Sequence, residues 1–118
     1  MTHPTYHAMT SVKLWGGDVA DYQAIHDWLD ATKECFADFR HRALRHHSQG
    51  CYEAERHFGH TITNSAGRIV AVRYICEQHI KEDCGGRIPT VADWLQEIPA
   101  KAWMSRGYRI TETPGATA

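Results

Sequence analysis

Paired cysteines, long apolar runs and an excess of charge of either sign are all missing from this sequence. Its four cysteines never form a C-x-x-C pair, which argues against a cysteine-based zinc finger. No run of about eighteen apolar residues occurs, so we expect no membrane-spanning helix. The formal net charge is −1, which gives no general attraction to nucleic acid or to anionic membranes.

Several functional motifs are missing as well. The chain has no Walker loop, no G-x-G-x-x-G and no G-x-S-x-G sequence, so the common nucleotide and serine-hydrolase sites are not expected. The opening residues, MTHPTYHAMTSV, contain no apolar stretch typical of a signal peptide. We therefore expect a cytoplasmic protein whose cysteines are mostly reduced thiols.

The size and composition are those of an ordinary globular protein. With 118 residues, of which 42% are hydrophobic, the chain is long enough to bury one core. We expect one globular domain over residues 1–104 and a flexible polar tail over residues 105–118.

Apolar residues at spacings of three and four predict several short helices. The first follows the N-cap Asp18, and its inner face comprises Tyr22, Ile25, His26 and Leu29. A second, ended by Gly50, has an apolar stripe of Cys35, Phe36, Phe39, Ala43 and Leu44. A third covers residues 51–58. The next covers residues 72–83, with an inner side of Ile75, Cys76, His79 and Ile80.

The remaining segments complete the predicted fold. Thr90 and Asp93 start a last helix that Pro99 ends, and its apolar face is Trp94, Leu95 and Ile98. Residues 61–63 and 68–72 flank the turn sequence Asn-Ser-Ala-Gly, which predicts a β-hairpin. Pro4 and the Gly16-Gly17 pair favour an extended segment over residues 1–17, with a short strand at 7–14. The fold class is thus α+β, mainly helical, with four to five short helices and a small β-hairpin.

Nine histidines are an unusual number for this length. They either decorate a solvent-exposed surface or converge on one site. His79 and Asp83 are four residues apart on a predicted helix, so they share one face, and both side chains are ligands for zinc, iron or manganese. The alternative is a simple hydrogen-bonded pair on that helix.

Two further groups admit two interpretations each. Asp38 can orient His41 toward a site, or these residues and Glu34 form a solvated charged stripe. Arg40, Arg42 and Arg45 can bind phosphate, or they are a solvated basic face.

Two predicted helices together suggest a metal site. We expect its core to be His46, His79 and Asp83, with His26 or His41 as the next ligand. His41 and His46 are five residues apart, about 500° around a helix, so their joint ligation would need a kink. A divalent metal, zinc first, with an open position would make hydroxide available, and Glu77 or Glu82 is the candidate general base.

Five stretches also resemble a known family: SVKLWGG, DFRHRALRHH, TITNSAGR, EQHIKED and RIPTVADWL. They resemble short bacterial and phage proteins of unknown function, over roughly residues 6–104. The resemblance implies no activity. It does imply a set of functional positions, namely His7, His26, His41, His46, His79 and Asp83. The composition is also similar to HD-type phosphohydrolases, but the only adjacent pair is His26-Asp27, without an upstream partner.

These observations lead to one leading hypothesis and two alternatives. The leading one is a small metal-binding protein that acts as a metal-dependent hydrolase on a phosphoester or nucleotide-like substrate. The second is a non-enzymatic phage or host-defence accessory protein that binds a ligand or a partner protein. The third is an interaction domain without a site. The expected partners are a small-molecule or phosphate-containing ligand and further copies of the chain.

Overall fold

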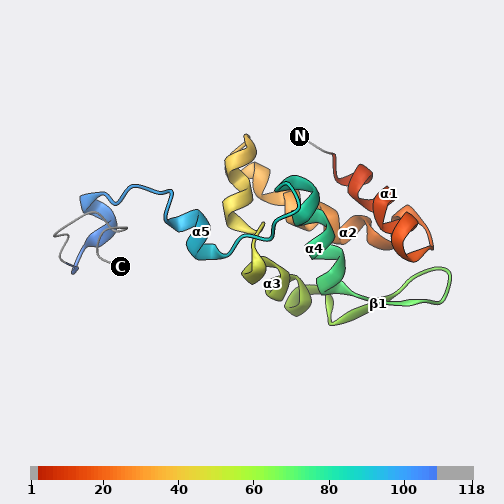
Figure 1. Ribbon diagram of the computed structural model, residues 1–118. Coiled ribbons are helices and arrows are strands. Elements are labelled where there is room, and N and C mark those ends of the chain that lie inside the picture. Colours follow the sequence, from red (N-terminus) through yellow and green to blue (C-terminus); the bar gives the residue numbers. More distant parts are fainter. Residues whose placement is uncertain (1–2, 109–118) are drawn as a thin grey trace.

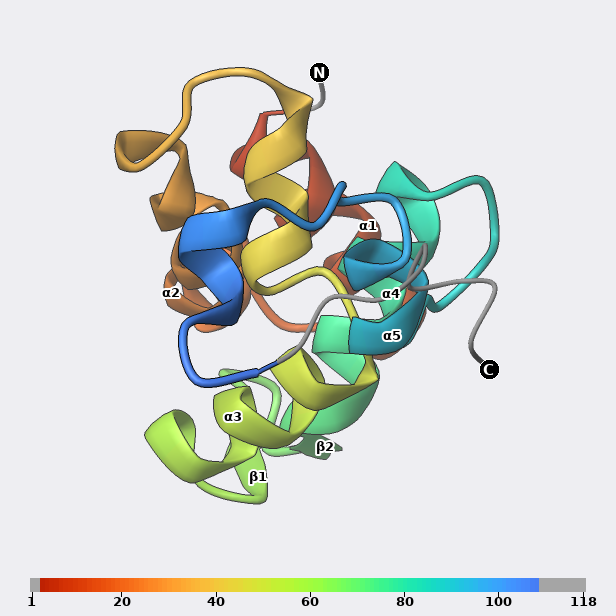
Figure 2. The same cartoon turned by 90° about the vertical axis from the view of Figure 1, so that its left-hand side faces the viewer.

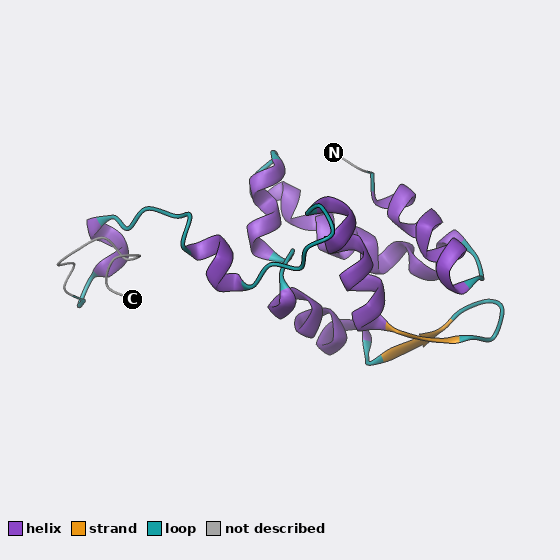
Figure 3. Cartoon of the chain, in the orientation of Figure 1, coloured by secondary structure: helices purple, strands orange, loops and turns teal. Residues whose placement is uncertain are grey.

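The computed structural model describes residues 3–108 and is mainly helical, with one two-stranded hairpin (Figures 1 and 3). In chain order the elements are α1 (Pro4–Trp15), α2 (Val19–Asp30), the 3₁₀ turns η1 (Ala31–Glu34) and η2 (Phe39–Leu44), α3 (Ser48–Phe58), β1 (Thr61–Thr63), β2 (Ile69–Ala71), α4 (Val72–Asp83), α5 (Val91–Leu95) and the 3₁₀ turn η3 (Ala102–Ser105). This confirms the α+β, mainly helical class. Among the described residues, no helix is long and apolar enough to cross a membrane.

The N-terminal segment is a helix, so the predicted extended segment and strand are wrong. Pro4 occupies the first turn, where its missing N–H removes no helical hydrogen bond. The His3 Nδ1 atom accepts a hydrogen bond from the Thr5 N–H at 3.1 Å, which caps this end. Gly16, at φ 82°, ends the helix. The proline therefore starts α1, and the buried face of α1 includes His7 and Ser11.

Helix α2 begins as predicted. The Asp21 carboxylate accepts a hydrogen bond from the Asp18 N–H at 2.7 Å and so fixes the first turn. The predicted inner face is buried, and it extends to the last residue, Asp30.

The segment after α2 differs from the prediction. Instead of one helix ended by Gly50, the chain forms η1 and η2, and α3 starts at Ser48. The predicted apolar stripe is largely on the surface, with Phe39 62% exposed. Gly50 lies inside α3, where a Cβ would collide with the Arg45 carbonyl oxygen. This glycine is needed for close backbone approach, and His47 caps α3 by accepting from the Gly50 N–H.

The predicted hairpin is confirmed, with Ile62 opposite Val70 in an antiparallel register. Asn64 connects it to the helices, because its amide nitrogen donates to the Trp15 carbonyl and to the Tyr22 hydroxyl at 3.1 and 3.0 Å. The turn thereby holds the hairpin against the α1–α2 connection.

Helix α4 lies at the centre of the molecule and packs on α1, α2 and α3 (Figure 2). Its bounds match the predicted 72–83 range, and its predicted inner side is fully buried. The hydrophobic core comprises Ala8, Tyr22, Ile25, Leu29, Cys51, Ala54, Val70, Val72, Ile75, Cys76 and Ile80. Six histidines of the described residues are also buried, at 7, 26, 41, 46, 47 and 79, which is an unusual polar content for an interior.

Helix α5 starts with the predicted Thr90–Asp93 capping box. Its predicted apolar face is not buried: Leu95 is 58% and Ile98 45% exposed, and the helix ends at Leu95, before Pro99. The reason is that the chain from α5 onward leads away from the other helices (Figure 1). The predicted flexible tail, 105–118, lies largely outside the described residues, and the single domain over 1–104 stays a prediction.

Candidate metal centre

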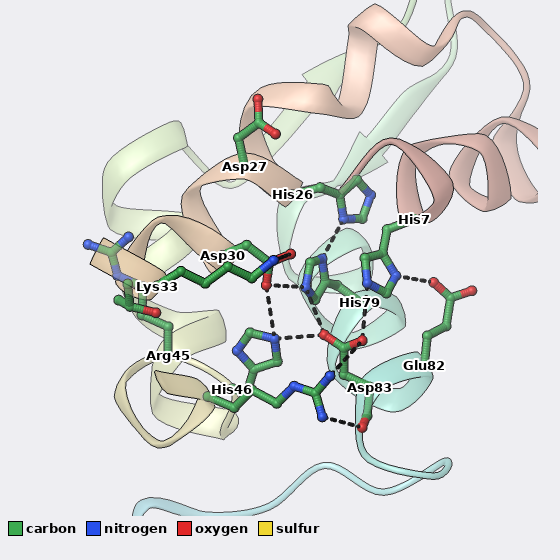
Figure 4. Close-up of polar contacts among 12 residues, drawn as sticks. His7, His26, Asp27, Asp30, Lys33, Arg45, His46, His79, Glu82 and Asp83 are labelled. Atoms are coloured by element: carbon green, nitrogen blue, oxygen red, sulfur yellow. Dashed lines mark hydrogen bonds and ion pairs between the residues drawn. The ribbon is translucent and has the colours of Figure 1, made fainter. Parts of the chain in front are cut away.

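Two helices and one connecting segment bring two histidines and two aspartates to a single point (Figure 4). Helix α2 supplies Asp30, the segment between η2 and α3 supplies His46, and α4 supplies His79 and Asp83. One ligand atom of each lies within 4.8 Å of the others. The structure therefore brings together the three residues at the centre of the sequence prediction and adds Asp30.

The four ligand atoms form a closed ring. His46 Nε2 lies 2.9 Å from Asp83 Oδ2 and 3.6 Å from Asp30 Oδ1. His79 Nε2 lies 3.1 Å from Asp83 Oδ2 and 3.3 Å from Asp30 Oδ1. Tetrahedral metal bonds of about 2.0–2.1 Å place ligand atoms about 3.4 Å apart. The ring therefore has close to the dimensions of a four-coordinate site, although its shorter sides also match hydrogen bonds.

The centre is buried and contains two negative charges. All four side chains are at most 4% exposed. Burial raises the pKa of Asp83, but the close contacts with His46, His7 and His79 outweigh it and hold that pKa well below its usual range. Burial likewise raises the pKa of Asp30, but the hydrogen-bond contact with His79 and the charges of His79, Lys33 and His46 together outweigh it, so the net shift is downward. Both aspartates are therefore carboxylates.

His46 is suited to act as a neutral ligand, and His26 beside His79 is neutral as well. Burial lowers the pKa of His46 to about 4, and burial lowers the pKa of His26 to about 2. At neutral pH these imidazoles are uncharged, which is the form that coordinates metals.

Two cations neutralise the outer oxygens of the aspartates. Arg42 Nη2 lies 3.6 Å from Asp83 Oδ1, and its Nη1 donates to the Asp83 carbonyl at 3.2 Å. Lys33 Nζ lies 3.7 Å from Asp30 Oδ2. These contacts leave Asp30 Oδ1 and Asp83 Oδ2 turned inward, toward the two imidazoles.

A chain of hydrogen bonds reaches His79 at Nδ1, the ring nitrogen that lies away from the two aspartates. Gln78 Nε2 donates to the His7 carbonyl at 2.9 Å and to Glu82 Oε1 at 2.8 Å, which directs Gln78 Oε1 toward Ser11. The Ser11 hydroxyl lies 2.6 Å from Gln78 Oε1 and 2.8 Å from His26 Nε2. His26 Nδ1 then lies 2.9 Å from His79 Nδ1.

His7 and Glu82 border the centre on the α1 side. His7 Nδ1 lies 2.6 Å from Glu82 Oε1, and its Nε2 lies 3.2 Å from Asp83 Oδ1. Burial lowers the pKa of His7, but hydrogen bonds to Asp83 and Glu82 outweigh it, so the net shift is upward. His7 thus connects Glu82 with the centre.

The other predicted ligands lie around the four-residue set. His26 contacts His79 but is not one of the four. His41 is buried, with Nδ1 2.9 Å from the Thr32 hydroxyl, and its ring lies edge-on to His46 at 5.5 Å. Glu77 is bonded to Arg73, on the outer side of α4.

The three arginines of the predicted phosphate site have separate partners. Arg40 is paired with Asp38, Arg42 with Asp83, and Arg45 donates to the Trp28 carbonyl. The Asp38 carboxylate therefore binds Arg40 and the Arg40 N–H, and it does not orient His41.

The sequence prediction did not include Asp30 among the ligands. A signal was nevertheless present. His26 and Asp30 repeat the H-x-x-x-D spacing of His79 and Asp83, so both carboxylates end a helix one turn after a histidine. Asp27, in contrast, is exposed and points away from the centre (Figure 4).

A surface pocket of about 490 Å³ borders the centre from the α5 side. Its lining includes Asp83, Arg42, Arg87, Phe39 and Trp94. Glu77 and Glu82 line a different pocket, of about 360 Å³, between α1 and α4.

The fold and the site thus define a small, mainly helical protein with a buried cluster of histidines and aspartates that can hold a metal ion. The chain belongs to the family of the domain of unknown function DUF6915, whose family model matches residues 2–104. This confirms the resemblance to a family of unknown function. No curated protein and no solved structure matches the chain.

Proposed function

We propose that this protein binds one divalent metal ion through Asp30 Oδ1, His46 Nε2, His79 Nε2 and Asp83 Oδ2. The observation that carries the proposal is the buried ring of these atoms, whose four sides of 2.9–3.6 Å lie near the ligand-to-ligand spacing of a four-coordinate site. Two buried carboxylates at one point need a positive charge between them, and a metal ion supplies it.

The ligand types indicate which metal is expected. Two imidazole nitrogens, two carboxylate oxygens and no sulfur suit zinc, iron or manganese, and four protein ligands in a tetrahedral ring favour zinc. A zinc site with four protein ligands has no open position, and such sites stabilise folds. The first role that we propose is therefore a tightly held ion that joins α2, α4 and the segment before α3. This role fits the non-enzymatic alternative, a protein that binds a ligand or partner elsewhere on its surface.

Metal-dependent hydrolysis is the second candidate, and the pocket beside Asp83 favours it. Arg42 and Arg87 line that pocket and are of the charge that a phosphoester or nucleotide-like substrate requires. This role needs a metal with more than four ligands, such as manganese or iron, so that a water can bind. Of the two candidate bases, Glu82 has a connection to Asp83 through His7, whereas Glu77 has none among the described contacts.

Metal content of the purified protein tests the proposal. The protein is prepared without a histidine tag, supplemented with zinc, desalted and subjected to elemental analysis. We expect about one metal per chain, and a sharp loss in His79→Ala and Asp83→Ala. His60→Ala is the matched control, because His60 is a histidine with an 87% exposed side chain whose partner within residues 3–108 is Glu55. Wild-type protein without stoichiometric metal would contradict the proposal.

A further inference from the structure

Ser11, His26 and Gln78 have no direct place among the four ligand atoms, yet all three are buried and bonded in series behind His79. An imidazole has two nitrogens, and the one that carries the hydrogen determines the one that can bind a metal. The hydrogen-bond directions along this series can be worked out one after the other.

The amide of Gln78 fixes the first direction. Its Nε2 faces the His7 carbonyl oxygen and the Glu82 carboxylate, both of which only accept hydrogen bonds from it. The Gln78 amide oxygen therefore faces Ser11 and must accept.

Ser11 passes this direction on. Its single hydroxyl hydrogen goes to Gln78 Oε1 at 2.6 Å or to the His7 carbonyl at 3.1 Å, and both are acceptors. The contact with His26 Nε2 at 2.8 Å is then a bond in which His26 Nε2–H donates to the Ser11 oxygen. His26 Nδ1 is left with a lone pair.

The last step concerns two imidazole nitrogens that face each other. His26 Nδ1 and His79 Nδ1 are 2.9 Å apart, and this distance requires one hydrogen between them. Because His26 Nδ1 has none, His79 Nδ1–H donates. Nε2 is then the nitrogen of His79 that is left for a metal ion, and it faces the two carboxylates at 3.1 and 3.3 Å.

We propose that Gln78, Ser11 and His26 are positioning residues, which hold His79 in the tautomer whose Nε2 lone pair points into the metal centre. This inference rests on the proposed metal function and adds the element that prepares the site before the ion binds. A histidine ligand is commonly oriented by the partner of its second ring nitrogen, and loss of such a partner typically costs about 10- to 100-fold in metal affinity.

The tautomer itself is measured without any metal. Long-range ¹H–¹⁵N correlation spectra of the metal-free, ¹⁵N-labelled protein should show hydrogen on His79 Nδ1 and on His26 Nε2. In Ser11→Ala the His26 Nε2–H loses its acceptor, so we expect both rings to move toward the opposite tautomers. A wild-type His79 that carries no hydrogen on Nδ1 would overturn the proposal.

Metal affinity provides the second test. Zinc competition with a chromophoric chelator should show Ser11→Ala and His26→Phe about 10- to 100-fold weaker than wild type. His57→Phe is the control, because it removes an exposed imidazole that stacks on Trp28, away from the series and the metal centre, and it should stay close to wild type. Normal zinc affinity in both Ser11→Ala and His26→Phe would overturn the positioning role of these residues while leaving the metal function intact. A wild type that binds no zinc would overturn the metal function, and the spectra would still decide the tautomer.

Discussion

At the scale of single residues, the two aspartates determine what the centre can hold. Asp30 and Asp83 each follow a histidine by one helical turn, and each has a pKa below its usual value despite burial. Two ionised carboxylates at one buried point repel each other unless a positive charge lies between them. Arg42 and Lys33 reach only their outer oxygens, so the inner oxygens remain for a cation.

Replacing one of these carboxylates with its neutral isostere should remove most of the binding. We expect Asp30→Asn to weaken zinc by more than about 100-fold, since it alters a direct ligand and not an orienting partner. Isothermal titration or chelator competition measures this. Asp27→Asn is the control from the same helix, because Asp27 is exposed and accepts a hydrogen bond from its neighbour Gln23. Equal affinities of the two variants would contradict the role of Asp30.

The buried histidines should make the metal-free protein sensitive to acid. Their pKa values, about 4 for His46 and about 2 for His26, lie below the ordinary value of 6.5, so these groups bind protons more readily when the chain unfolds. Their contribution to stability is present above pH 6.5 and is lost as pH falls, although His7, whose pKa is raised, opposes this.

We therefore expect the free energy of unfolding of the metal-free protein to fall by on the order of 2 kcal/mol between pH 7 and pH 5. Urea titrations at several pH values measure the change. A stability that is constant or rises over this interval would show that the histidines are not buried in neutral form.

At the scale of elements, the sequence was sufficient to predict a helix or turn wherever its local signals agree with the face that the element buries. Helix α4 has its predicted bounds because its apolar spacing matches the face that it buries, and Asp18 and Thr90 cap their helices by local bonds. The hairpin turn was similarly local. The site histidine and aspartate of α4 could be predicted for the same reason, since both lie on one regular helical face.

The failures arose where distant contacts override a local pattern. Pro4 was interpreted as a helix breaker, but it lies in the first turn of α1, where proline is compatible with a helix. The apolar residues around Phe39 suggest a buried helix, but Thr32 and His41 are the buried side chains of this segment. Asp30 joined the site through packing of α2 on α4. The H-x-x-x-D spacing marks it as the counterpart of Asp83, but local spacing does not show that the two carboxylates meet.

Gly50 gives a test at this scale. Gly50→Ala should destabilise the protein by about 1–3 kcal/mol, because the new Cβ collides with the Arg45 carbonyl and shifts the segment that carries His46. Thermal unfolding measures the effect. Gln49→Ala, at the exposed neighbouring position of α3, should be near neutral. A Gly50→Ala variant as stable as wild type would show that the Arg45 carbonyl does not pack against Gly50 as closely as the structure has it.

At the scale of the whole molecule, the proposed ion connects parts of the chain that lie far apart in sequence. Asp30, His46 and Asp83 belong to three separate segments. The core beside them contains several buried histidine side chains. A ligand that binds only the folded state stabilises it, by about 2.7 kcal/mol at a hundredfold excess over the dissociation constant.

Zinc should therefore raise the melting temperature by on the order of 10 °C, and a chelator should reverse the change. Scanning calorimetry with and without chelator measures this. Asp83→Asn should show no zinc-dependent rise. A wild-type melting temperature that does not respond to zinc would contradict an ion that joins the three segments.

X-ray absorption at the zinc edge of the zinc-loaded protein tests the central claim most directly. The structure predicts four nitrogen or oxygen ligands at about 2.0–2.1 Å, with the outer-shell scattering of two imidazoles and no sulfur. Sulfur in the spectrum would assign the ion to a cysteine such as Cys84, next to Asp83, and would contradict the assignment of the two histidines and two aspartates as its ligands.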